Sequence, residues 1–181
     1  MTYLRPGSWP REDKAAYRGY VGLWADVTSA LVAKGDRVHL FITDPGDTDA
    51  LRDVWERLHE SARDGTSIEK AETPDALLNL FRRLDVVISS RLHGVLLAMV
   101  AGRPVLGLSH ERKVRAAMSD AGVSSFCLDL PSATPEQIAE RLEVLRSDLD
   151  ACRERLVEYG RVARTAVRKQ NEMLSRLLRV R

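Results

Sequence analysis

The stretch DVVISSRLHGVLLAMVAGRPVLGLS, residues 85–109, decides the fold, because it places two buried strands on either side of one helix. The run DVVIS is short, apolar and rich in β-branched residues, as buried strands are. Small and apolar residues then continue over the length of a helix, Leu92–Ala101, which Gly102 ends. PVLGLS is a second short apolar run. Two apolar strands joined by a helix are typical of a parallel sheet that helices cover on both faces.

The same alternation continues on both sides of this stretch. Helical spacing of apolar residues predicts a helix over Ala15–Lys34, which Gly35 ends, and VHLFIT at 38–43 predicts the next strand. Thr73 and Pro74 suit the start of a further helix. We expect the remaining strands at 2–5, 67–69 and 125–130, and the remaining helices at 47–63, 74–83, 112–121, 134–145 and 149–178.

This order of elements predicts an α/β fold: a doubly wound, mostly parallel sheet with helices on both faces and right-handed crossovers, as in Rossmann-like domains. We expect residues 1–148 to form this domain. The segment 149–181 has one apolar helical stripe among many charges, and it is expected to pack on the domain or on a partner.

Composition excludes several classes of function. The 28 Lys and Arg nearly balance the 26 Asp and Glu, so the formal charge of +2 does not suggest general nucleic-acid binding. Cys127 and Cys152 lack the spacing of a disulfide framework or a zinc site, and no metal is expected. A signal-peptide pattern and a membrane-spanning apolar run are both missing, so we expect a cytoplasmic protein that is not integral to a membrane.

The candidate site lies where the first of the two quoted strands ends. In open parallel sheets, ligands bind outside the carboxyl ends of the strands. Ser90, Arg91, Leu92, His93 and Gly94 occupy that place at the start of the next helix, whose free backbone N–H groups favour an anion. Arg91 adds a planar fork of donors, His93 a titratable group, and Gly94 a point where a ligand can approach the backbone. This pattern indicates an anion site with a proton donor or acceptor beside it.

Residues after other strands point to the same crevice. Arg5 follows the first strand, Thr43 and Asp44 the second, and Ser109, His110 and Lys113 follow PVLGL. A plainer interpretation stays open for each of them, because an Arg or His at a strand end often caps a helix or pairs with a carboxylate. The sequence contains no GxGxxG, GxxxxGK[ST] or GxSxG motif, so common dinucleotide, P-loop and serine-hydrolase sites are disfavoured.

The run Asp85–Val114 resembles the polysaccharide pyruvyl transferase family. The features that carry the resemblance are the Asp-led strand, the RLH triplet, the GRPVLGLS strand and the Lys a few residues later, with YLRP near the start. The resemblance extends over most of residues 2–145. It implies the C-terminal half of a two-domain, GT-B-like architecture, either cut from a longer protein or a naturally short relative.

What the family does follows from the same resemblance. Its characterised members transfer a pyruvyl group from phosphoenolpyruvate to two hydroxyls of a sugar as a ketal, in exopolysaccharide or cell-wall biosynthesis. Arg91 and His93 match the Arg and His associated with donor binding and catalysis. We expect phosphoenolpyruvate as the donor substrate, no other cofactor, and a sugar or polysaccharide precursor as the acceptor. The donor-binding residues expected here are Arg5, Ser90, Arg91, Leu92, Gly94, Ser109 and Lys113.

Two other functions remain open at this stage. One is a GT-B-like glycosyltransferase domain that uses the same crevice for a sugar nucleotide. The other is a non-catalytic binding or assembly subunit that kept the fold. The resemblance also leaves open whether an N-terminal domain or a second copy of the chain is a partner, and whether the isolated chain is a complete enzyme.

Overall fold

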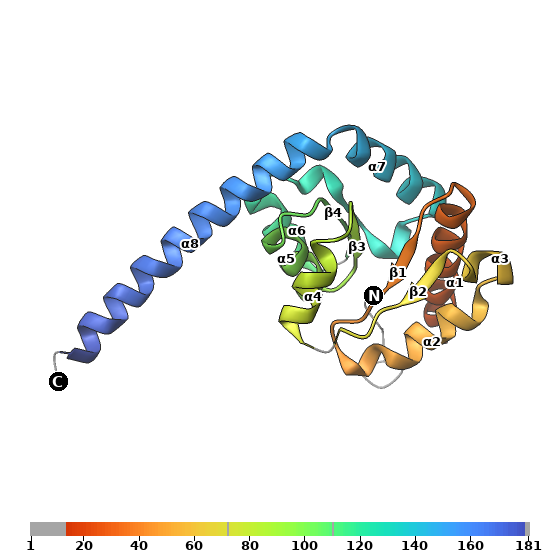
Figure 1. The fold of residues 1–181 in the computed structure, drawn as a ribbon, viewed down its shortest axis with the longest axis horizontal. Coiled ribbons are helices and arrows are strands. Elements are labelled where there is room, and N and C mark those ends of the chain that lie inside the picture. The colour runs from red at the N-terminus through yellow and green to blue at the C-terminus, as the bar shows by residue number, and fades with distance from the viewer. Residues whose placement is uncertain (1–13, 72, 110, 180–181) are drawn as a thin grey trace.

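The computed structural model describes residues 14–71, 73–109 and 111–179. It confirms the predicted α/β class, since short parallel strands lie among helices that cover them (Figure 1). The strands are β1 (Val38–Leu40), β2 (Thr66–Ile68), β3 (Val87–Ser89), β4 (Val105–Leu108) and β5 (Cys127–Leu128). The helices are α1 (Lys14–Ala33), α2 (Thr48–Arg57), α3 (Glu60–Arg63), α4 (Pro74–Phe81), α5 (Leu92–Val100), α6 (Arg112–Asp120), α7 (Pro135–Ser147) and α8 (Leu149–Arg179).

Glycines end three of these helices as the sequence predicts. Gly35, Gly102 and Gly122 follow α1, α5 and α6, and all three have positive φ angles of 91°, 67° and 69°. Residues with a Cβ rarely adopt that conformation. The predicted start of α4 is also confirmed, because the Thr73 hydroxyl accepts a hydrogen bond from the backbone N–H of Ala76.

Among the described residues, the strands pair in two parallel groups. β1 pairs with β2, with Val38 opposite Thr66. In the second sheet β4 lies between β3 and β5, with Val87 opposite Val105 and Gly107 opposite Cys127. No strand within the described ranges joins β1 to β3. The predicted strand at 2–5 lies outside the described residues.

The predicted helix at 47–63 is interrupted. A short 3₁₀ turn (Pro45–Asp47) precedes α2, and α2 and α3 are separated at Leu58, where the backbone is extended and the side chain is buried. The Arg63 guanidinium compensates for the break, because its Nε and Nη2 donate to the carbonyl oxygens of Trp55 and Glu56 at 3.2 and 2.9 Å. Burial of Leu58 and this local hydrogen bonding override the helical periodicity.

Other boundaries shift in the same way. The strand expected at 38–43 ends at Leu40, before the turn in which the Asp44 carboxylate accepts from the N–H of Gly46 at 2.8 Å. The strand expected at 125–130 shortens to β5 between two 3₁₀ turns, Ser124–Phe126 and Leu130–Ser132. Pro131 lies in the second of these turns, and proline lacks the N–H that a continuing ladder needs.

The core consists of the apolar strand residues and the helix faces packed on them. Val87, Val105, Leu106 and Leu108 are fully buried or nearly so. α8 packs on this body only near its start, where Cys152 and Leu156 are buried, and its later turns project away from the body (Figure 1).

Candidate functional site

The carboxyl ends of β3 and β4 share one turn geometry. The Ser89 hydroxyl oxygen accepts a hydrogen bond from the backbone N–H of Arg91 at 3.2 Å, and the Ser109 hydroxyl oxygen accepts one from Glu111 at 3.1 Å. Both serines are buried. Each hydroxyl turns the chain sharply from a strand into the helix that follows, so the residues after the strands lie at the edge of the sheet where ligands bind in this architecture.

Gly94 allows α5 to lie against the end of β3. A Cβ built on Gly94 would be 2.2 Å from the Ser89 hydroxyl oxygen and 3.0 Å from the Ser89 Cβ. No other residue fits there without displacing backbone or a buried side chain. This contact is a packing reason for the glycine, separate from the ligand approach that the sequence suggests, which stays a prediction.

Arg91 forms a double hydrogen bond with Asp47, a residue that the sequence analysis did not single out. Arg91 Nε lies 2.9 Å from Oδ2 and Arg91 Nη2 lies 2.5 Å from Oδ1. The Asp47 side chain has no exposed area, whereas 27% of the Arg91 side chain is exposed. The hydrogen bonds to Asp47 raise the pKa of Arg91, so the guanidinium stays charged.

This pair bears on the plainer interpretation of Arg91, and anion binding by Arg91 stays a prediction. The plainer one, a strand-end arginine paired with a carboxylate, is correct as far as Nε and Nη2 are concerned. The carboxylate offsets the positive charge and holds the guanidinium in one orientation. The Nη1 amino group stays outside the pair, on a side chain that solvent reaches.

Tyr20 of α1 belongs to the buried side of the same site. Its hydroxyl lies 3.4 Å from the Ser90 hydroxyl oxygen, and both residues are buried. Burial raises the pKa of Tyr20 far above its usual range, and the nearby Asp47 carboxylate raises it further. The phenol therefore stays protonated. In the sequence, Tyr20 is one residue of the helix predicted over Ala15–Lys34, and only its phenolic oxygen hints at a polar partner.

The other predicted residues have different surroundings. His93 and Lys113 are exposed on the first turns of α5 and α6, two helices that contact each other, and Leu92 is half-buried. Arg5 and His110 lie outside the described residues. The structure thus joins Asp47, Arg91 and Ser89 by hydrogen bonds and places the Tyr20–Ser90 contact beside them, with His93 on the exposed side of the same helix start.

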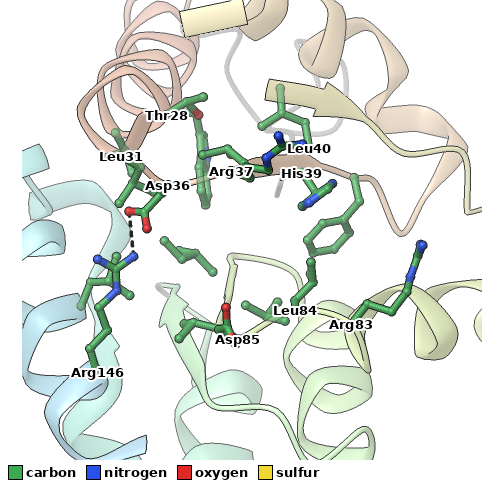
Figure 2. A pocket seen from close by; sticks show the side chains of 18 of the residues that line it. Thr28, Leu31, Asp36, Arg37, His39, Leu40, Arg83, Leu84, Asp85 and Arg146 are labelled. Atoms are coloured by element: carbon green, nitrogen blue, oxygen red, sulfur yellow. Dashed lines mark hydrogen bonds and ion pairs between the residues drawn. The ribbon is translucent and has the colours of Figure 1, made fainter. Parts of the chain in front are cut away.

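A cavity of about 710 Å³ lies away from this group, between β1 and β3 (Figure 2). Across residues 14–71, 73–109 and 111–179, no cluster of three or more His, Cys, Asp or Glu side chains could hold a metal ion. Cys127 and Cys152 are free thiols. No helix in the described part of the chain has the length and apolar character that crossing a membrane requires.

Comparison with known proteins agrees with the RLH resemblance. Residues 8–112, more than half of the chain, match the model of the family described as polysaccharide pyruvyl transferase. The match includes Asp47, the Ser89–Gly94 segment and Ser109, whereas Arg5 precedes it and Lys113 follows it directly. No curated protein and no solved structure gives a significant match. The chain belongs to the polysaccharide pyruvyl transferase family.

Proposed function

We propose that this chain binds phosphoenolpyruvate at the start of α5 and serves in the transfer of its pyruvyl group to a sugar as a ketal. The observation that carries the proposal is the Arg91 guanidinium, which the buried Asp47 carboxylate orients at the first turn of α5. A dianionic phosphate or a carboxylate suits the remaining Arg91 donor together with the backbone N–H groups of that turn. Ser90, Leu92, Gly94, Ser109, Lys113 and Arg5 complete the proposed donor-binding set.

The chemistry assigns His93 a separate role. Ketal formation begins when a proton adds to the methylene carbon of the enol phosphate while one sugar hydroxyl adds to the neighbouring carbon and loses its proton. The second hydroxyl then forms a bond to that carbon and loses its proton as the C–O bond to phosphate breaks, and the departing inorganic phosphate takes up a proton. His93 is exposed beside Arg91, where an imidazole can supply the first proton. Arg91 and the helix start stabilise the negative charge of the departing phosphate.

The two other functions make different demands on the same site. A GT-B-like glycosyltransferase domain would bind a nucleoside diphosphate more tightly than phosphoenolpyruvate, and an assembly subunit would bind neither. Thermal unfolding in the presence of each ligand distinguishes the three functions, because a ligand that binds the folded state raises the midpoint temperature of unfolding. We expect phosphoenolpyruvate to raise it more than UDP or GDP does. A larger effect of either nucleotide would contradict the proposal.

The role of Arg91 is tested by calorimetric titration of phosphoenolpyruvate into variants. Arg91→Ala alone leaves the Asp47 carboxylate buried without its partner, which costs about 3 kcal/mol of stability. The double variant Arg91→Ala/Asp47→Ala removes that charge as well and is expected to recover stability. We expect at least about tenfold weaker binding in both, the loss of one charge-assisted hydrogen bond.

His93→Ala is the comparison within the same experiment. It is expected to weaken binding less than Arg91→Ala does while it abolishes phosphate release with a panel of monosaccharide acceptors. His59→Ala, at another exposed histidine before a helix, is the matched control. If the double variant bound phosphoenolpyruvate as tightly as the unmodified chain, Arg91 would be only the ion-pair partner of Asp47.

A further inference from the structure

The part of α8 that projects beyond the body carries a row of exposed apolar side chains. Every residue of this distal segment, residues 164–178, is exposed. Five large apolar side chains in it are between 53% and 78% exposed: Val167, Met173, Leu174, Leu177 and Leu178. Single exposed apolar residues are common on soluble proteins, whereas a row of them along one helix marks a surface that another molecule covers.

The apolar side chains of the distal segment share one face of the helix. Successive residues of an α-helix are about 100° apart, so the apolar residues of the segment all fall within an arc of about 140°. This apolar face consists of Ala166, Val167, Met173, Leu174, Leu177 and Leu178. Gln170 is the one polar residue of the distal segment that lies within the same arc. The face is about 22 Å long, enough to pack along a helix of about four turns.

Basic side chains flank the apolar face on both sides. Lys169 and Arg176 lie along one edge, and Arg164 and Arg168 lie beyond the other. These four form no ion pair with a described residue, whereas three arginines of α8 nearer the body each pair with a carboxylate, at 2.6 to 3.2 Å. Glu172, the one acidic residue of the distal segment, lies on the opposite side of the helix. The positive charge beside the apolar face therefore favours a partner that brings carboxylates or other anions.

The direction of the apolar face distinguishes a protein from a membrane. A basic amphipathic helix often lies on an anionic bilayer. Leu174, however, follows Leu156 by 18 residues, which is about five full turns, so both side chains point the same way from the helix axis. Leu156 is buried against the body. A flat bilayer placed against the apolar face would therefore meet the body, which lies on the same side of α8 (Figure 1).

A second copy of the distal segment does not supply the missing charge. Charged residues beside the seam of two packed helices select partners of opposite charge. Both sides of the apolar face are basic in each copy, so two copies packed through this face would bring like charges together. The charge therefore favours a different chain.

We propose that the apolar face of α8 is a docking surface for an amphipathic helix of another protein, in which Asp and Glu flank the apolar residues. The partner's carboxylates pair with Lys169 and Arg176 on one side and with Arg164 on the other. Gln170 lies among the apolar residues and favours a polar side chain opposite it, which fixes the register of the two helices. The start of α8 thus packs on the body, and its distal segment packs on the partner.

The binding of two synthetic peptides to the full chain tests the proposal. Both peptides are four-heptad helices with Leu at the a and d positions. One has Glu and the other Lys at the e and g positions, so that like charges prevent either peptide from pairing with itself. Fluorescence anisotropy of the labelled peptides measures their binding. We expect the Glu peptide to bind at least about tenfold more tightly than the Lys peptide, and added salt to reduce this difference.

Variants of the distal segment test which residues carry the binding. Leu174→Ala/Leu177→Ala should weaken binding of the Glu peptide by at least about tenfold, because it removes apolar area from the interface. Val157→Ala is the matched control, since Val157 is 62% exposed on α8 but lies outside the apolar face, and it should leave binding unchanged. Lys169→Glu/Arg176→Glu should reverse the preference, so that the Lys peptide binds more tightly. All of these positions except Arg176 and Lys169 are apolar, and all are exposed, so circular dichroism should show the same helix content in every variant.

Four results would overturn the proposal, and none of them depends on which donor the start of α5 binds. Absence of binding by both peptides, or the same affinity for both, would mean that the face does not select an acidic helix. An unchanged preference in Lys169→Glu/Arg176→Glu would remove the role of the flanking charges. Sedimentation of the chain with phosphatidylglycerol vesicles that Leu174→Ala/Leu177→Ala abolishes would assign the face to lipid. A dimer in light scattering that the same double variant dissociates would assign it to a second copy.

Discussion

At the scale of single residues, the site depends on contacts that a small change in volume disturbs. Arg91 is oriented by a carboxylate with no exposed area, and Ser90 is held beside the Tyr20 hydroxyl. Gly94 sets how closely α5 approaches Ser89. These contacts connect α1, the turn before α2 and the start of α5. A substitution that breaks any one of these contacts should therefore displace the proposed donor site.

Gly94→Ala is expected to destabilise the fold, because the added Cβ would overlap the Ser89 hydroxyl oxygen at 2.2 Å and the Ser89 Cβ at 3.0 Å. Overpacking of this kind costs about 1–3 kcal/mol. Gly19→Ala is the control, since a Cβ on Gly19 meets nothing within 4 Å on an exposed part of α1, and it should stabilise the helix by about 0.5–1 kcal/mol. Urea unfolding measures both. Equal stability of the two variants would contradict the packing role of Gly94.

At the scale of elements, a hydrogen-bonded triad connects β1 to β2. His39 Nδ1 lies 2.8 Å from both the Ser67 hydroxyl oxygen and Glu69 Oε1, and the Ser67 hydroxyl also donates to Glu69 at 2.8 Å. These contacts give His39 a structural role between the two strands. The hydrogen bonds from His39 and Ser67 lower the pKa of the Glu69 carboxyl.

The lowered pKa of Glu69 predicts how stability depends on pH. Because the carboxyl has a lower pKa folded than unfolded, the carboxylate stabilises the fold above its unfolded pKa of about 4.3, and this contribution is lost as pH falls through the folded pKa. Glu69→Gln should therefore cost about 1–2 kcal/mol at neutral pH and progressively less below about pH 4. Glu140→Gln, at an exposed position of α7, is the control. Unfolding free energies measured from pH 7 to 3 check this, and a cost independent of pH would contradict it.

At the scale of the whole molecule, α8 has two unequal parts. Its start packs on the body, with Leu156 at 1% exposure, whereas Leu177 near its end is 69% exposed on the projecting turns (Figure 1). Leu156→Ala should lower the free energy of unfolding by about 2–5 kcal/mol, because it opens a cavity in the core. Leu177→Ala should change it by less than about 0.5 kcal/mol. A loss above 1 kcal/mol for Leu177→Ala would indicate that the projecting turns are buried against another surface in solution.

Much of the fold could be predicted because it rests on local patterns. The alternation of apolar strands and amphipathic helices, the glycines after α1, α5 and α6, and the Thr73 cap depend on residues within one or two turns of each other. Breaks that depend on distant packing were missed, such as the one at Leu58, whose side chain enters the core. Local periodicity cannot register such a contact.

By itself, the sequence determined the α/β class, the order of the elements, and the placement of Ser90, Arg91 and His93 at the carboxyl end of a strand, through periodicity and the RLH run. Only the tertiary structure decided what surrounds them. Asp47 reaches Arg91 across 44 residues of chain, Tyr20 reaches Ser90 across 70, and β4 lies between β3 and β5. The physical reason is that short-range preferences select a helix or a strand, whereas the partner of a buried charge or of a strand edge depends on how the finished elements pack.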